Sequence, residues 1–201
     1  MAAAEQLFAE RSVDSVSLNE ITVAAGQKNR NALQYHFGNR EGLLQAIIDR
    51  HAGRVAELRT AFMAADTGRD STPARAAARG LVMPLAQHIR EDGAGSHYVK
   101  ILSQLAALNN EVVNPASRSG LSFQNEEQLQ SVMGAALSHL GSAEAKRRIF
   151  LTVSMTFHGL ADICRAADSV DVSPTLARRD PLFQQLALSV EALLSAPALG
   201  D

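Results

Sequence analysis

Apolar side chains recur every three or four residues along most of the chain, and no stretch alternates apolar and polar residues as a half-buried strand would. Pro84 falls inside one of the helical patterns, where it should produce a kink, and residues 66–73 and 169–179 are polar enough to be loops. The spacing therefore predicts an all-α chain with helices at residues 2–11, 18–25, 28–37, 40–65, 74–91, 98–108, 129–140, 143–167 and from 181 onwards.

Two short helices joined by a tight turn are predicted within residues 17–44. Ser17 and Glu20 have the spacing of a capping box, in which each side chain accepts a hydrogen bond from a free backbone N–H at the start of a helix. Gly26 supplies the conformational freedom for the turn, and Asn39 can cap the long helix that follows. This layout predicts a helix-turn-helix that a long helix ties to the rest of the chain.

The second helix of this pair has one polar face. At 100° per residue, Asn31, Gln34 and Tyr35 lie opposite Leu33, and Arg30 lies on the flank. Arginine pairs favourably with guanine, and asparagine or glutamine with adenine, in the major groove. The pattern therefore favours a DNA-reading helix, and the alternative interpretation is an ordinary solvated helix face.

The charge balance agrees with a small DNA-binding surface. The whole chain has a formal net charge of -2, which does not suggest a polyanionic partner. Between Glu20 and Glu41, however, there is no acidic residue, whereas Lys28, Arg30 and Arg40 lie there. Because only a local surface contacts DNA, we interpret this basic segment as the electrostatic footprint.

Composition narrows the class of protein further. Hydrophobic residues make up 46% of the chain, which is enough to form a core, and a single cysteine, Cys164, permits no internal disulfide. No apolar run approaches the length of a membrane-spanning helix, and the first residues do not form a basic segment followed by an apolar one. We therefore expect a soluble cytoplasmic protein.

The residues that could support catalysis or metal binding are not arranged for it in the sequence. The histidines show neither an H-x-x-x-H nor an H-E-x-x-H spacing. Ser154, His158 and Asp162 would share one helix face in a row, which is not the converging geometry of a catalytic triad. The sequence thus predicts neither an enzyme, nor a metal site, nor a cofactor.

The helix predicted at residues 143–167 is apolar on more than one side and is expected to be buried on more than one side. Thr156, His158, Asp162 and Cys164 interrupt it with polar groups that need partners. These partners could belong to a ligand cavity or to the second chain of a dimer, and both interpretations stay open. Candidate lining residues for a cavity are Tyr98, Phe123, Met133, Met155, Phe157, His158 and Asp162, although ordinary core is the simpler interpretation of the apolar ones.

The motifs L-F-A-E-R, A-A-G, Y-H-F and R-E-G-L-L follow one another in this order between Ala2 and about Arg50. In this segment the chain resembles the N-terminal domain of the tetracycline-repressor (TetR) family of bacterial regulators, although the spacing from Gly26 to Phe37 is one residue longer than usual. The resemblance implies a three-helix DNA-binding domain at residues 1–50 and a helical regulatory and dimerisation domain at residues 51–201.

Further expectations follow from the resemblance. It assigns base contacts to Arg30, Asn31 and Gln34, and phosphate contacts to Tyr35, His36 and Arg40. Further DNA-binding candidates at the helix starts are Ser17, Asn19, Lys28 and Asn29, with Thr22 a weaker one. The resemblance also implies a homodimer formed by the last two long helices, a near-palindromic operator with half-sites about one turn, roughly 34–36 Å, apart, and a small-molecule effector that releases a repressor. The alternative is a helical small-molecule-binding or protein-interaction module that has lost DNA binding.

Overall fold

The computed structural model describes the whole chain apart from residues 28, 30–31, 66–70, 109–120, 122–125 and 200–201. Within the described residues every regular element is a helix, which confirms the predicted all-α fold. The helices are α1 (Ala2–Glu10), α2 (Leu18–Ala24), α3 (Ala32–Phe37), α4 (Arg40–Ala65), α5 (Pro73–Glu91), α6 (Gly95–Leu108), α7 (Glu126–Ala136), α8 (Ser142–Asp168), α9 (Pro174–Ala177) and α10 (Arg179–Ser195).

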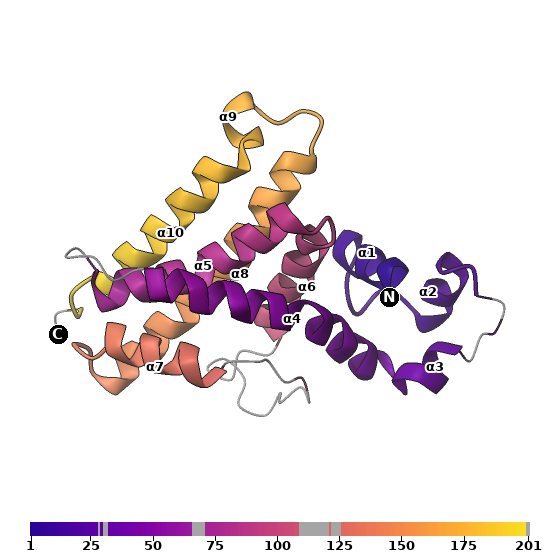
Figure 1. The fold of residues 1–201 in the computed structure, drawn as a ribbon, viewed down its shortest axis with the longest axis horizontal. Helices are drawn as coiled ribbons and strands as arrows, with labels where there is room; N and C mark the ends of the chain where they lie inside the picture. The colour runs from indigo at the N-terminus through magenta and orange to yellow at the C-terminus, as the bar shows by residue number, and fades with distance from the viewer. Residues whose placement is uncertain (28, 30–31, 66–70, 109–120, 122–125, 200–201) are drawn as a thin grey trace.

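Helices α1, α2 and α3 gather at one end of the long helix α4 (Figure 1). Phe8 of α1 and Ile21 of α2 are fully buried in the same hydrophobic core as Leu43 and Ile47, which lie in the first turns of α4, and Phe37 of α3 packs against this core. Burial of a large apolar side chain stabilises a fold by about 1.5–3 kcal/mol. The shared core therefore helps to hold the three short helices together with α4, and we call residues 1–50 the head.

The remaining length of α4 packs along α5 in the rest of the molecule, which we call the body. Arg54 of α4 donates to both carboxylate oxygens of Glu91 on α5, at 2.9 and 3.1 Å. One turn further along, buried Arg59 donates to the carbonyl oxygen of Gly80 at 3.1 Å. Because α4 runs unbroken through residue 50, the head and the body share one continuous helix.

A second connection links α1 to α6. The backbone N–H of Val13 donates to the side-chain oxygen of Gln104 at 2.7 Å, and the amide nitrogen of Gln104 donates to the carbonyl oxygen of Phe8 at 2.8 Å. One side chain of the body thus satisfies two backbone groups of the head. Such buried backbone groups are costly to leave without a partner, so this bond pair fixes the orientation of the head.

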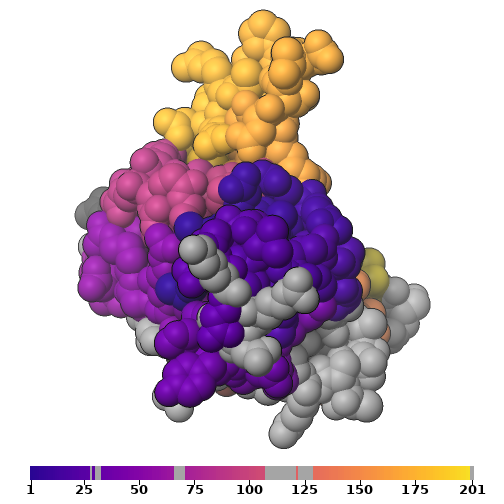
Figure 2. Space-filling model, turned by 90° about the vertical axis from the view of Figure 1, so that its right-hand side faces the viewer, coloured from indigo at the N-terminus to yellow at the C-terminus, as the bar shows by residue number. Residues whose placement is uncertain are grey.

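Helix α9 and the ends of α8 and α10 next to it project from the rest of the body (Figure 1), and Figure 2 shows this region in orange and yellow rising beyond the head. Arg148 of α8 is 8% exposed and donates to the carbonyl oxygens of Leu193, Ala196 and Pro197 at 2.5–3.1 Å. The last carbonyls of a helix have no partner within that helix. The Arg148 guanidinium therefore caps the C-terminal end of α10 and joins it to α8.

The structure corrects three details of the predicted layout. The predicted loop at residues 169–179 contains the short helix α9, and α10 starts at Arg179, two residues before Pro181. Helix α7 ends at Ala136 and not at Leu140. One side of α8 is buried within a single chain, whereas Leu151 and Met155 on another side are 48% and 36% exposed, so burial of α8 on more than one side stays a prediction. Pro84 lies inside α5, which continues on both sides of it.

Candidate nucleic-acid interface and effector pocket

The start of α2 is fixed by the predicted capping box. The N–H of Glu20 donates to the Ser17 hydroxyl at 3.1 Å, and the N–H of Ser17 donates to the Glu20 carboxylate at 2.8 Å. Arg11 also pairs with Glu20 at 2.8 Å. The hydrogen bond from the Ser17 backbone, followed by that from Arg11, lowers the pKa of Glu20 to about 2. The Glu20 carboxylate at the start of α2 is thus held ionised, and its negative charge is compensated by Arg11 and by the backbone N–H of Ser17.

Two glycines shape the chain on either side of α3. Gly26 and Gly38 have φ angles of 66° and 72°, a region that residues with a Cβ atom rarely adopt. Gly26 follows α2, and Gly38 follows Phe37, the last residue of α3. These two turns set α3 apart as a separate short segment between α2 and α4.

Helix α3 is anchored on one side and exposed on the other. Leu33 and Phe37 are partly buried and pack against the core. Gln34, Tyr35 and His36 are exposed, and 87% of the Tyr35 side chain is accessible to solvent. A large aromatic residue with this degree of exposure is unusual at the surface of a helix, and this arrangement leaves polar side chains accessible to a groove.

The junction between α3 and α4 is closely packed. Asn39 accepts a hydrogen bond from the N–H of Gly42 at 2.8 Å, which confirms it as the cap of α4. A Cβ atom on Gly42 would lie far inside van der Waals contact of the Phe37 carbonyl oxygen. Arg40 donates to the carbonyl oxygen of Val13 and is partly buried. Part of the Arg40 guanidinium is therefore used to tie α4 to the loop that precedes α2.

The other predicted DNA-binding residues lie near this exposed face or fall outside the description. Ser17 and Asn19 at the start of α2 are exposed, and so is Asn29. Thr22 is buried and donates to the carbonyl oxygen of Leu18, so it is not available for DNA. Lys28, Arg30 and Asn31 lie outside the described residues. The structure thus brings exposed hydrogen-bonding groups of α2 and α3 to one end of the head.

A second feature is a pocket of about 460 Å³ between α5, α7 and α8. Its walls are mostly apolar, and Gln130 and Thr152 are the polar residues among them. Thr152 is fully buried and its hydroxyl has no hydrogen-bond partner among the described residues. A mostly apolar cavity with few polar groups is typical of a small-molecule site. Its lining residues are Leu81, Leu129, Gln130, Met133, Gly134, Leu137, Ala145, Ile149, Thr152, Val153 and Phe157.

The residues predicted for a cavity are divided by the structure. Met133 and Phe157 line the pocket. Met155 and His158 are exposed, and Asp162 is exposed and pairs with Arg165 at 2.7 Å. Phe123 lies outside the described residues, and Tyr98 is buried elsewhere, against two histidines. The sequence left open whether α8 faces a cavity or a second chain, and periodicity alone could not tell which of its faces lines the pocket.

Those two histidines form a cluster that the sequence did not reveal. His51 of α4 and His88 of α5 are 37 residues apart, yet their ring nitrogens lie 2.7 Å from each other. Burial, followed by the neighbouring His51, lowers the pKa of His88. Burial also raises the pKa of Tyr98 above its usual range. No local spacing encodes such a pair, because it depends on how α4 packs against α5.

Comparison with known proteins gives a match for the first part of the chain. Residues 1–47 match the family model described as bacterial regulatory proteins, tetR family. No curated protein matches the chain. Among the described residues there is no helix of the length and apolarity needed to span a bilayer. The matched segment contains α1, α2, α3 and the first turns of α4. The chain thus carries the N-terminal domain of the tetR family, and the protein is a DNA-binding transcriptional regulator.

Proposed function

We propose that the protein is a repressor that binds a near-palindromic operator as a homodimer and leaves it when a small molecule enters the pocket between α5, α7 and α8. The observation that carries the DNA-binding half of this proposal is the exposure of Gln34 and Tyr35 on a helix whose opposite side is anchored. The proposal assigns the chain no catalytic role.

The proposed DNA contacts divide by chemistry. Gln34, with Arg30 and Asn31 assigned from the sequence alone, is proposed to contact base edges in the major groove, where amide and guanidinium groups form bidentate pairs. Phosphates are proposed to be contacted by a second set of donors. That set comprises Ser17, Tyr35, His36 and the N–H groups of Arg40 that Val13 does not use, with Lys28 assigned from the sequence alone. Asn19 and Asn29 are exposed and are proposed as further DNA contacts.

The proposed dimer forms through α8 and α10. Leu151 and Met155 are one turn apart on α8 and are 48% and 36% exposed, and Leu188 on α10 is 57% exposed. Apolar side chains on two neighbouring helices favour association with a second copy of the same surface, since symmetric pairing is the commonest form of assembly. A twofold dimer presents two heads, which explains the expected palindromic operator.

The proposed coupling passes from the pocket to α3 through α5 and α4. Leu81 of α5 forms part of the pocket wall. The Arg54–Glu91 and Arg59–Gly80 contacts link α5 to α4, whose first turn holds α3 in place. A ligand that shifts α5 should therefore move the heads, and its effect is limited by its differential affinity for the two conformations.

The test of DNA binding uses the intergenic DNA upstream of the gene for this chain. Fluorescence anisotropy should show tight binding to this DNA that weakens steeply with salt, because phosphate contacts release counterions. Light scattering of the same sample should give twice the mass of one chain. Absence of binding at low salt would favour the alternative, a small-molecule-binding or protein-interaction module without DNA binding.

The pocket is tested separately with a fluorescent apolar probe, anilinonaphthalene sulfonate. Ala145 lines the pocket, whereas Ala143, two residues earlier on α8, is exposed and does not. Ala145→Leu should reduce probe binding by filling the cavity, and Ala143→Leu should leave it unchanged. Equal binding by both variants would show that the probe binds elsewhere.

A further inference from the structure

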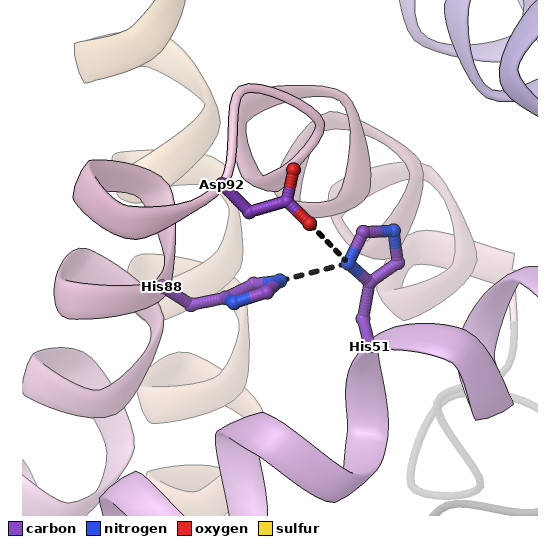
Figure 3. A group of neighbouring side chains, drawn as sticks. All are labelled: His51, His88 and Asp92. Atoms are coloured by element: carbon purple, nitrogen blue, oxygen red, sulfur yellow. Dashed lines mark hydrogen bonds and ion pairs between the residues drawn. The ribbon is translucent and has the colours of Figure 1, made fainter.

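Three side chains from the junction of the head and the body point toward one another (Figure 3). They are His51 of α4, His88 of α5 and Asp92, the residue directly after α5. The Nδ1 atom of His51 lies 2.7 Å from Nε2 of His88 and 4.0 Å from an oxygen of Asp92. One ligand atom from each residue lies within 4.8 Å of the other two.

The two histidines are buried and lack part of their hydrogen bonding. Their exposed fractions are 1% and 3%. Among the described residues, Nδ1 of His88 has no hydrogen-bond partner, and Nε2 of His51 makes no hydrogen bond but lies 3.5 Å from a carboxylate oxygen of Glu5. Within a neutral pair, one ring must donate the shared proton and the other must accept it. A cation bound between the rings would accept the lone pairs of both facing nitrogens, Nδ1 of His51 and Nε2 of His88, and would remove this constraint.

Neighbouring side chains and a backbone N–H hold the His51 ring and the Asp92 carboxylate in place, as the groups around a metal site do. Glu5 of α1 is 1% exposed, and its carboxylate lies 3.5 Å from Nε2 of His51, on the side away from His88. Tyr98 stacks on the His51 ring with a centroid distance of 4.5 Å. Asp92 accepts a hydrogen bond from the N–H of Ala94 at 2.8 Å. A carboxylate behind a ligating histidine and a hydrogen bond on a ligating carboxylate are the usual second layer of a metal site.

We propose that His51, His88 and Asp92 bind one divalent transition-metal ion, with Zn²⁺ the best match. Two imidazole nitrogens and one carboxylate oxygen suit zinc, whereas magnesium and calcium prefer oxygen alone. Asp92 is 39% exposed, which leaves an entrance and a fourth position for water. Zinc–nitrogen bonds of about 2.0–2.1 Å at tetrahedral angles separate the two nitrogens by about 3.3 Å, so the rings must part slightly from their 2.7 Å distance.

The position of the site gives the ion a structural consequence. It would join α4 directly to the end of α5, and Glu5 would connect α1 to the same centre through His51. An ion that binds only the folded chain stabilises it by mass action. The proposal is independent of the effector pocket and of operator binding.

The test is isothermal titration of the untagged, metal-stripped full chain with ZnCl₂, with Co²⁺ absorption as a second measurement. The wild-type chain should bind one ion. Asp92→Asn keeps an oxygen for the Ala94 N–H but loses the charged ligand, and it should bind at least about tenfold more weakly. His88→Gln should not bind, and His139→Gln, which changes an exposed histidine on the body, should bind like the wild type.

The proposal is overturned if the wild-type chain binds no stoichiometric ion, or if Asp92→Asn and His88→Gln both bind as tightly as it does. Circular dichroism shows whether each variant is folded. If His88→Gln does not fold, Asp92→Asn decides the matter, because Asp92 lies near the surface and its replacement keeps the local backbone bond.

Discussion

Gly42 offers a sharp test of how α3 is held on α4. A Cβ atom there would penetrate the Phe37 carbonyl oxygen and approach its carbonyl carbon to 3.2 Å, and a backbone group cannot easily move aside. Gly53 lies in the same helix, and a Cβ atom there would meet nothing within 4 Å. Replacement of either glycine by alanine gains about 1 kcal/mol of helix propensity. The difference between the two variants therefore isolates the cost of the clash, about 1–3 kcal/mol.

The assay is urea unfolding of Gly42→Ala and Gly53→Ala beside the wild-type chain, followed by operator titration. We expect Gly53→Ala to be about 0.5–1 kcal/mol more stable than the wild type. Gly42→Ala should be less stable than Gly53→Ala by the clash cost and should bind DNA more weakly, because relief of the clash must move the end of α3. If the two variants were equally stable, the close packing of Phe37 on Gly42 would be refuted.

Four further predictions concern other parts of the chain. The pKa of Glu20 is lowered from 4.5 to about 2, so the ionised carboxylate should stabilise the fold fully above pH 4.5 and lose this effect as the pH falls through 2. In urea unfolding, the difference in stability between the wild type and Glu20→Gln should therefore shrink between these two pH values. Arg148→Lys should lower the free energy of unfolding by about 1–3 kcal/mol, since an ammonium cannot serve all the carbonyl groups that cap α10. Thr152→Val should leave the free energy of unfolding unchanged or raise it by up to about 1 kcal/mol, because it removes a buried hydroxyl that has no partner among the described residues. Leu188→Glu should weaken dimerisation by at least about 30-fold in analytical ultracentrifugation, since the half-exposed leucine occurs twice in a symmetric interface; an unchanged dimer would exclude this face.

Features that depend on neighbouring residues were predictable from the sequence. The Ser17–Glu20 capping box and the Asn39 cap are both present, because each needs only a few residues of chain. The anchored and exposed sides of α3 also follow from helical periodicity, as Leu33 and Tyr35 show.

Features that depend on packing between distant segments were not predictable. The His51–His88 contact needs α4 and α5 to meet at one register, and spacing along the sequence carries no sign of it. Likewise, the apolar pattern of α8 predicts burial on more than one side, whereas a single chain leaves Leu151 exposed. Periodicity reveals which residues share a face, and it does not reveal what covers that face.

The most direct test of DNA recognition compares operator binding by the wild-type chain, Gln34→Ala and Tyr35→Ala, with Thr60→Ala on an exposed part of α4 as the control. Loss of a base contact by Gln34→Ala should cost about 1–3 kcal/mol, or roughly 5- to 150-fold in affinity, and reduce discrimination against unrelated DNA. Thermal stability should stay within about 0.5 kcal/mol of the wild type, because both side chains are exposed. Unchanged affinity and discrimination in both α3 variants would contradict the assignment of α3 as the recognition helix.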